Sequence, residues 1–190
     1  MADVTGVVLA AGAGTRAGGP KALRIENGRS WLVMATESLL QAGCARVVVV
    51  LGARASDARA LLPRDPSGRR DSRVDVAVAT RWEEGMSHAL RVGLLAATGA
   101  AALITLVDLP DLPLAVYLRV LGAGQAPEDL RQATFGGRPG HPVLIGAHHF
   151  IAAADATTGD RGASDYLAAM AVELVECGDL AEGLDRDGPA

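Results

Sequence analysis

Apolar and polar positions alternate along the chain in blocks that predict strands separated by helices. Short apolar runs that end at glycines, prolines or charged residues are typical of buried strands. Such runs predict strands at Val4–Ala10, Arg46–Leu51, 74–79, 101–107 and 172–175, with extended segments at 133–135 and 142–145 around a glycine-rich turn. Helical composition predicts helices at 32–42, 56–62, 86–97, 113–121 and 162–170.

Apolar strands that alternate with helices are typical of a mostly parallel sheet. We therefore expect an α/β fold with a single doubly wound, mostly parallel sheet and helices on both faces. No repeat or linker interrupts the pattern, and we expect the polar stretch at 63–72 to be a surface loop. The 190 residues are predicted to form one domain, 1–190. Ligands of such folds bind beyond the carboxyl ends of the strands.

Composition and charge argue against several classes of function. The chain has 18 basic and 22 acidic residues, which gives a net charge of −4 and argues against general nucleic-acid binding. The longest uncharged run, 92–107, is 16 residues long and contains glycines, so no membrane span is expected. Cys44 and Cys177 are isolated in the sequence, which favours two reduced thiols over a disulfide or a metal site. The N-terminus does not resemble a secretory signal, because Asp3 comes before any basic residue. We expect a cytoplasmic protein.

The glycine-rich segment L-A-A-G-A-G-T-R-A-G-G-P-K follows the first predicted strand, at 9–21. Small residues let the backbone approach a ligand, and successive N–H groups can hold phosphate oxygens. Arg16 and Lys21 would add positive charge. Lys21 is the one lysine beside 17 arginines, and a compact ammonium is not interchangeable with a guanidinium at a crowded phosphate. The segment therefore predicts a phosphate-binding loop, with a ligand-free glycine turn as the plain alternative.

A dinucleotide-binding fingerprint is one interpretation of this loop. Gly12, Gly14 and Ala17 fit G-x-G-x-x-A. That fingerprint also needs an immediate helix and an acidic residue at the end of the second strand. Here the run at 18–20 is Gly-Gly-Pro, which breaks a helix, and no carboxylate follows the second strand before Asp57.

A P-loop is the second interpretation, but Pro20 precedes Lys21, and Ala22 replaces the hydroxyl that would hold Mg²⁺. The third is a loop that wraps a nucleoside triphosphate and ends in a proline-lysine pair. This third pattern resembles the signature L-A-A/G-G-x-G-x-R-x-G-x-P-K of the nucleotidyltransferases that activate sugars and cofactors.

Further motifs resemble one branch of these enzymes, the molybdenum-cofactor cytidylyltransferase-like, or MobA-like, NTP transferases. They are G-M-S-H-A-L-R-V-G-L at 85–94, L-V-D-L-P-D-L at 106–112, G-G-R-P-G-H-P-V at 136–143 and G-D-R-G-A at 159–163. The family usually has a second serine in place of His88. The family's D-I-D-T-P segment is matched in part by D-R-D-G-P at 185–189, where Arg186 replaces isoleucine and Gly188 replaces threonine. The resemblance spans residues 4–189.

The resemblance implies a Rossmann-like nucleotidyltransferase fold and transfer of a CMP, or other NMP, group from an NTP to a phosphorylated acceptor. The expected acceptor is molybdopterin, with release of pyrophosphate and with a molybdoenzyme or its chaperone as a candidate partner. CTP is favoured, because the side chain of Ala11 narrows the base pocket. The implied nucleotide-binding residues are Leu9, Ala10, Ala11, Gly12, Ala13, Gly14, Arg16 and Lys21.

The same resemblance implies roles for the other motifs. Catalysis would rest on Lys21, Arg16 and Asp108. Asp108 directly follows an apolar strand, where a carboxylate can hold a Mg²⁺ ion that bridges triphosphate oxygens, and Asp187 would be the second metal ligand. The acceptor would be bound by Ser87, His141 and Asp160, and Ser87 is also expected to cap the helix that starts there.

Two other function classes stay open. A loop that holds a triphosphate can also hold the pyrophosphate of a nicotinamide cofactor, so an NAD(P)-dependent oxidoreductase on the same fold is one alternative. The other is a non-catalytic carrier that delivers a cofactor to a partner enzyme. Dependence on Mg²⁺ favours transfer, whereas nicotinamide binding without metal favours the oxidoreductase.

Overall fold

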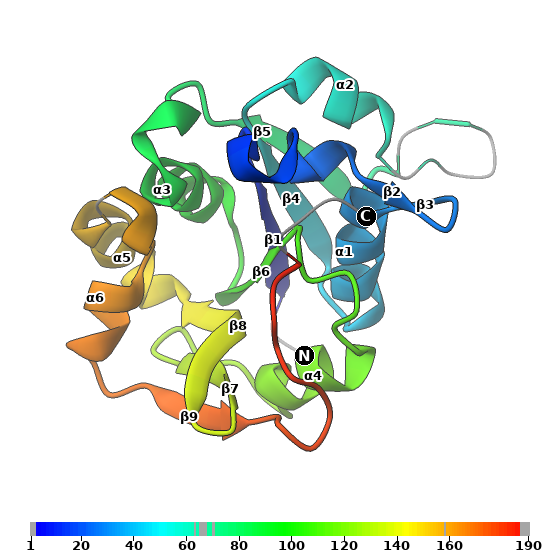
Figure 1. Cartoon of the computed structure of the whole chain (residues 1–190). Helices are drawn as coiled ribbons and strands as arrows, with labels where there is room; N and C mark the ends of the chain where they lie inside the picture. The colour runs from blue at the N-terminus through cyan, green and yellow to red at the C-terminus, as the bar shows by residue number, and fades with distance from the viewer. Residues whose placement is uncertain (1–2, 63, 65–67, 70, 158, 187–190) are drawn as a thin grey trace.

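A seven-stranded sheet forms the centre of the protein and confirms the predicted α/β fold (Figure 1). The computed structural model describes residues 3–62, 64, 68–69, 71–157 and 159–186. The strand order is β5-β4-β1-β6-β8-β7-β9. The strands are β1 Val4–Ala10, β4 Arg46–Leu51, β5 Val74–Val78, β6 Ala101–Leu106, β7 Leu130–Phe135, β8 Arg138–Gly146 and β9 Glu173–Glu176. A separate two-stranded hairpin pairs β2 Ile25–Glu26 with β3 Arg29–Ser30.

Parallel pairing brings the ends of the central strands together. β1 pairs in parallel with β4 and with β6, and Leu9 lies opposite both Val50 and Leu106. β5 extends this parallel half beyond β4. β8 runs antiparallel to both β6 and β7, and β9 is parallel to β7. Segments that follow β1 and β6 therefore leave the sheet at the same edge.

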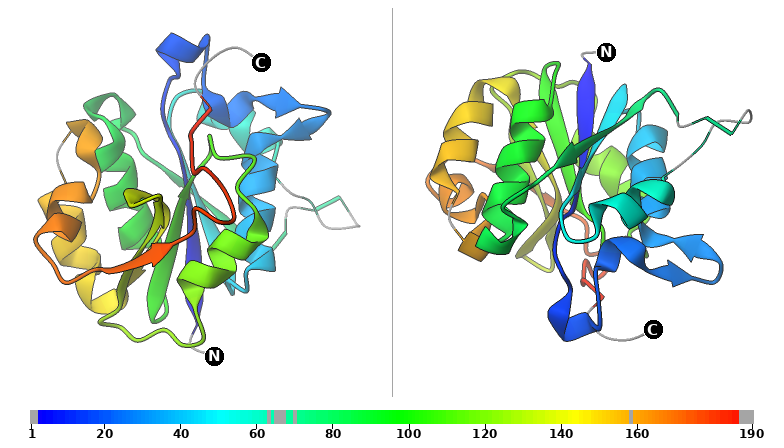
Figure 2. Two further views of the ribbon diagram at one scale, coloured as in Figure 1. Left: turned by 60° about the horizontal axis from the view of Figure 1, so that its bottom comes forward. Right: turned by 90° about the horizontal axis from the view of Figure 1, so that it is seen from above.

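Helices cover both faces of the sheet, as Figure 2 shows. They are α1 Trp31–Gln41, α2 Ala55–Ala60, α3 Met86–Ala96, α4 Leu114–Leu121, α5 Phe150–Ala156 and α6 Ser164–Ala168. Buried side chains of α1, α2 and α4 pack with Val8 and Val49 on one face. Those of α3, α5 and α6 pack with Val7 and Val50 on the other. Successive side chains of a strand point to opposite faces of the sheet, so neighbouring residues of one strand belong to different hydrophobic cores. No helix of the described residues is long and apolar enough to cross a membrane.

The boundaries of the central elements agree with the prediction, whereas several peripheral ones do not. β1 and β4 have the predicted ends, and α1, α3 and α4 differ by about one residue. The helix predicted at 56–62 runs from Ala55 to Ala60, and its N-cap is Arg54 in a left-handed conformation. The prediction missed the β2–β3 hairpin, and the helix predicted at 162–170 is shorter.

The last described segment returns across the sheet. Residues 177–186 follow β9 and run past β8 toward the end of β6 (Figure 1). Glu176 fixes the start of this segment: its carboxylate accepts the backbone N–H groups of Gly136, Gly137 and Gly178 and the hydroxyl of Thr134. These hydrogen bonds lower the pKa of Glu176 to about 2. At the other end, the backbone N–H of Arg186 donates to the carbonyl of Asp108 at 3.0 Å.

Candidate active site

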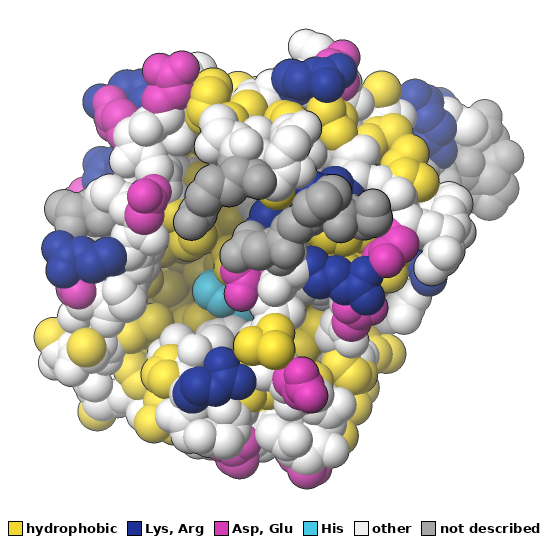
Figure 3. Space-filling view, viewed as in Figure 1, with side chains coloured by type: hydrophobic (Ala, Val, Ile, Leu, Met, Phe, Trp, Pro, Cys, Tyr) yellow, Lys and Arg dark blue, Asp and Glu magenta, His cyan; other side chains and the backbone are white. Residues whose placement is uncertain are grey.

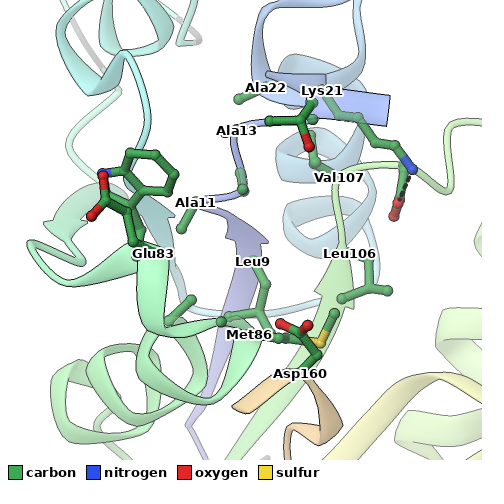
Figure 4. A pocket seen from close by; sticks show the side chains of 18 residues that line it. Leu9, Ala11, Ala13, Lys21, Ala22, Glu83, Met86, Leu106, Val107 and Asp160 are labelled. Carbon is green, nitrogen blue, oxygen red and sulfur yellow. Dashed lines mark hydrogen bonds and ion pairs between the residues drawn. The ribbon is translucent and has the colours of Figure 1, made fainter. Parts of the chain in front are cut away.

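A cleft of about 500 Å³ opens where β1 and β6 end. Figure 3 shows it as a hollow with hydrophobic walls, and Figure 4 shows its side chains. The residues that line it are Leu9, Ala10, Ala11, Gly12, Ala13, Gly14, Thr15, Lys21, Ala22, Trp82, Glu83, Gly85, Met86, Ala89, Leu106, Val107, Asp108 and Asp160. Every nucleotide-binding residue implied by the sequence is among them except Arg16, whose side chain lies outside the described part of the structure.

The glycine loop folds on itself beside the cleft. Gly14 has φ = 57°, and its carbonyl accepts the N–H groups of Ala17 at 2.9 Å and Gly19 at 3.0 Å. A Cβ atom on Gly14 would lie 1.9 Å from the carbonyl oxygen of Gly19, so only glycine fits. A single 3₁₀ turn, Thr15–Ala17, follows and ends at Gly18, so the loop does not lead into the helix that a dinucleotide fingerprint requires.

An ion pair joins the end of the glycine loop to the segment that follows β6. Lys21, in the 3₁₀ turn Lys21–Leu23, donates from Nζ to Oδ2 of Asp108 at 2.8 Å. The dashed line in Figure 4 marks this pair. Only 16% of the lysine side chain and 15% of the aspartate side chain are exposed. Partial burial strengthens the attraction between the charges and leaves both groups at the surface of the cleft.

Arg186 connects the two chain segments that carry this ion pair. Its guanidinium binds Glu26 on β2, five residues after Lys21, and Asp111, three residues after Asp108, the latter at 2.6 Å. These carboxylates raise the pKa of Arg186 above its usual value. Asp187, the second implied metal ligand, follows Arg186 and lies outside the described residues.

The glycine loop is tied to the same cluster from its other side. Glu26 also accepts the indole N–H of the buried Trp31 at 3.2 Å. The guanidinium of Arg24 lies over that indole, 5.4 Å from the ring centroid, and donates to the carbonyl of Ala17 in the loop. Contacts of Arg24, Glu26 and Arg186 therefore connect the glycine loop with the segments that carry Lys21 and Asp108.

The start of α3 differs from the prediction for Ser87. Gly85, with φ = 105°, is the N-cap of α3, and Ser87 is buried in the first turn without a side-chain cap hydrogen bond. Ser87 does not line the cleft, whereas Asp160 does. A Cβ on Gly85 would come within 2.5 Å of Oδ1 of Asp160, so the motifs at 85–94 and 159–163 pack against each other here. Asp160 lies beside Met86 in Figure 4.

His141 lies near the start of β8 and lines a smaller pocket that adjoins the cleft through Leu9 and Met86. Burial lowers the pKa of His141 to about 4, although the charges of Asp108 and Asp185 act in the opposite direction. The imidazole is therefore neutral at physiological pH. The negative charge of Asp108 thus acts on His141, although Asp108 follows β6 and His141 belongs to β8.

The chain matches the MobA-like NTP transferase domain over residues 6–174. It belongs to that family. The nicotine blue oxidoreductase of Paenarthrobacter nicotinovorans is 36% identical over 195 residues, which cover 97% of this chain and 92% of the relative.

Solved structures agree with this assignment to the MobA-like family. Rv0371c of Mycobacterium tuberculosis H37Rv superposes with a TM-score of 0.79 at 26% identity, covering 98% of this chain and 93% of that one. A structure of the same protein in complex with manganese has a TM-score of 0.68 and covers 92% and 87%. A nucleotidyl transferase from Methanothermobacter, Mth528, shares the fold at 23% identity, with a TM-score of 0.79 and coverage of 98% and 92%.

Several cleft residues of this MobA-like domain were not anticipated from its sequence. Trp82 and Glu83 precede the G-M-S motif and line the cleft. Trp82 packs so closely on Gly52 that a Cβ there would lie 2.6 Å from Cβ of the tryptophan. The short polar segment around Trp82 has neither strand nor helix periodicity, so only its position next to a glycine motif could have suggested a role.

Proposed function

We propose that this protein transfers a CMP group from CTP to a phosphorylated acceptor, with molybdopterin as the candidate acceptor and pyrophosphate as the second product. The observation that carries the proposal is the Lys21–Asp108 pair, held at 2.8 Å between the glycine loop and the end of β6. A cation and a carboxylate thus lie side by side in the lining of a cleft of nucleotide size, where the carboxylate could hold a metal. Membership of the MobA-like family supports the same chemistry.

The chemistry needs positioning and neutralisation of charge more than a covalent catalyst. A terminal phosphate oxygen of the acceptor attacks the α-phosphorus of CTP in line. The bond from that phosphorus to the oxygen bridging to the β-phosphate breaks, and pyrophosphate leaves with the electron pair. Lys21 would neutralise the α-phosphate, Arg16 would bind the β- and γ-phosphates, and the N–H groups of residues 12–14 would hold the nucleotide.

A divalent cation fits this site through Asp108. Within the described ranges, no group of three or more histidine, cysteine, aspartate or glutamate side chains could form a cage for a metal. Mg²⁺ does not need one, because it is usually held by one or two carboxylates together with substrate phosphates and water. Bound there, Mg²⁺ would neutralise charge on the triphosphate. Asp108, with Asp187 as a proposed second ligand, would hold it, and the manganese complex of Rv0371c supports this part of the proposal.

Of the remaining residues, some would recognise the acceptor and others the base. Asp160 lines the cleft and His141 lines the smaller pocket that adjoins it, and both would face the acceptor. Ser87 is buried under the start of α3, so we assign it a supporting role beneath the acceptor site. The side chain of Ala11 lines the cleft and would favour a pyrimidine over a larger purine.

The test is pyrophosphate release from CTP and a molybdopterin acceptor by the wild type, Lys21→Ala and Asp108→Asn. Both variants should lose at least about 100-fold in rate, which corresponds to ~2.7 kcal/mol of lost transition-state stabilisation. Arg138→Ala, which breaks an exposed contact to the carbonyl of Glu182, is the control and should keep full activity. Thermal melting would establish that each variant folds. An active Lys21→Ala protein would contradict the proposed role.

A second candidate function is an NAD(P)-dependent oxidoreductase, because the relative at 36% identity carries an oxidoreductase name. Thermal shifts with CTP, GTP, ATP, NADH and NADPH, each with and without Mg²⁺, separate the two functions. A ligand at about 100 times its Kd adds roughly 2.7 kcal/mol of stability. Stabilisation by CTP that requires Mg²⁺ supports transfer. Stabilisation by a reduced nicotinamide without metal, with CTP inert, supports the oxidoreductase.

A further inference from the structure

Lys21 and Asp108 neutralise each other at the place where the proposed function needs both charges. Nζ of Lys21 lies 2.8 Å from Oδ2 of Asp108, and the two side chains are only 16% and 15% exposed. In Figure 4, the dashed line runs from the end of the Lys21 side chain to this oxygen. Under the proposed function, the ammonium would bind a phosphate and the carboxylate would hold a metal. Each group is therefore bound to a competitor of its own ligand.

A divalent cation on its own would meet an unfavourable charge at Asp108. The ammonium of Lys21 neutralises the carboxylate, and partial burial of the pair weakens the screening of its repulsion toward a second cation. Asp111, three residues further along the chain, binds Arg186 at 2.6 Å. The described part of the chain has no group of three or more histidine, cysteine or acidic side chains that could hold a metal instead. A free divalent cation should therefore bind Asp108 poorly while Lys21 stays in place.

A triphosphate would reverse this balance, because it offers Lys21 another set of anionic oxygens. The backbone around Lys21 is fixed: its carbonyl accepts the N–H of Arg24 at 3.1 Å, and the carbonyl of Pro20 accepts that of Leu23 at 3.0 Å. The long, flexible side chain of a lysine can nevertheless move without the backbone. Its ammonium could therefore turn from Asp108 to a phosphate and release a carboxylate oxygen for the metal.

A lysine at this position suits such an exchange better than an arginine would. Lys21 is the one lysine beside 17 arginines in the chain. A guanidinium can bind both oxygens of a carboxylate through two parallel hydrogen bonds, whereas an ammonium acts as a point charge. An arginine would therefore hold Asp108 more firmly and release the carboxylate less readily.

We propose that Lys21 holds the place of the divalent cation on Asp108 until a triphosphate binds, so that metal and nucleotide enter the site together. Lys21 then has two roles: it excludes free metal before the nucleotide binds, and it neutralises a phosphate afterwards. The proposal rests on the proposed function in naming a triphosphate as the ligand that draws Lys21 away. The antagonism between Lys21 and a metal rests only on the ion pair itself.

Titration of the full chain with Mn²⁺ alone, followed by electron paramagnetic resonance of the free ion, tests the antagonism. No CTP or acceptor is added, so the outcome does not depend on whether nucleotidyl transfer occurs. Lys21→Met removes the ammonium and keeps a long side chain. Arg138→Met removes one positive charge at an exposed position and is the matched control for net charge. The double variant Lys21→Met/Asp108→Asn shows whether the metal binds at Asp108.

We expect Lys21→Met to bind Mn²⁺ at least about tenfold more tightly than the wild type, because the repulsion by the ammonium is gone. Arg138→Met should bind Mn²⁺ like the wild type, and the double variant should lose the gain. Thermal melting would establish that each variant folds. Equal Mn²⁺ affinities of the wild type and Lys21→Met, or a gain that survives in the double variant, would overturn the proposal.

The exchange of partners by Lys21 can be followed directly, because carbon-13 labelled lysine gives one side-chain NMR signal in a chain with one lysine. CTP without metal should shift this signal as the ammonium leaves Asp108 for a phosphate. In Asp108→Asn, which cannot form the ion pair, the signal should differ from that of the wild type before CTP is added. CTP that binds without moving the signal would overturn the exchange. CTP that does not bind would contradict the proposed function, and the Mn²⁺ titrations alone would then decide the antagonism.

Discussion

The two halves of the sheet contribute to the site in different ways. In the parallel half, β1 and β6 end at one edge, and the chain beyond them supplies backbone groups, a glycine loop and the Lys21–Asp108 pair. In the other half, β8 runs in the opposite direction and presents His141, while β7 presents Gln132. Under the proposed function, the first half would bind phosphates whatever they are attached to, whereas binding in the second would depend on particular side chains. Specificity for the acceptor should therefore reside in the antiparallel half.

The largest expected effect comes from the backbone of the parallel half. Gly14→Ala would place a Cβ atom 1.9 Å from the carbonyl oxygen of Gly19 at a residue with φ = 57°, so the loop must change shape. Nucleotide affinity should fall at least about 100-fold, or ~2.7 kcal/mol. Isothermal titration calorimetry with CTP and Mg²⁺ would measure it.

Gly12→Ala is the matched control for the loop, because a Cβ there meets nothing within 4 Å. This variant should melt at the wild-type temperature, and any loss of CTP affinity would report a direct approach of the nucleotide to Gly12. If Gly14→Ala binds CTP as well as the wild type does, the glycine loop is not the phosphate site, and the contrast between the two halves disappears.

A smaller effect should arise in the antiparallel half, from His141. Its pKa in the folded protein is about 4, below the unfolded value of 6.5, because burial disfavours the charged imidazole. As the pH falls from about 6.5 toward 4, the unfolded chain takes up a proton that the folded protein does not, and stability is lost. Between pH 7 and 5, this loss should be on the order of 2 kcal/mol. Urea unfolding at both pH values would measure it.

His141→Asn should remove that part of the pH dependence, so the wild type should lose more stability than the variant on acidification. His148→Asn, at an exposed position, is the control and should behave like the wild type. Equal slopes for the wild type and His141→Asn would mean that the imidazole is as well solvated in the folded protein as in the unfolded chain.

The smallest expected effect concerns Arg186, where the last described segment supports both Lys21 and Asp108. Arg186→Ile removes two ion pairs that are partly exposed, so the free energy of unfolding should fall only slightly. The KM for CTP should nevertheless rise by roughly three- to tenfold, because an ångström-scale misplacement of catalytic groups is costly. Arg29→Ile breaks an exposed pair with Glu37 and should lower stability by a similar amount without changing KM.

The sequence predicted the parallel half well because its signals are local. Continuous apolar runs such as Val4–Ala10 can only be buried strands in an α/β pattern, and the glycine loop must follow one of them. The β2–β3 hairpin was missed although its signal was present: Asn27 and Gly28, with φ of 50° and 75°, form the two-residue turn that Asn-Gly favours. Each strand has only two residues, too few for a periodicity.

Other features depend on contacts between distant segments. His149 is half-buried and contacts the Tyr166 hydroxyl at 2.7 Å and the carbonyl of Glu128 at 3.1 Å. Ser87 was expected to cap α3, but the chain enters the helix through Gly85, which packs on Asp160. A single sequence carries no signal for such pairings, and the meeting of Lys21 with Asp108 could be predicted only through the resemblance.

The contact between Arg186 and Glu26 joins residues 160 positions apart. During synthesis at roughly 5–20 residues per second, the parallel strands and the glycine loop emerge from the ribosome well before Arg186 does. A nascent chain can thus form most of the sheet while the neighbourhood of Lys21 and Asp108 still lacks its final support. Under the proposed function, full affinity for a nucleotide would then be reached late in biogenesis, after the hydrophobic core has formed.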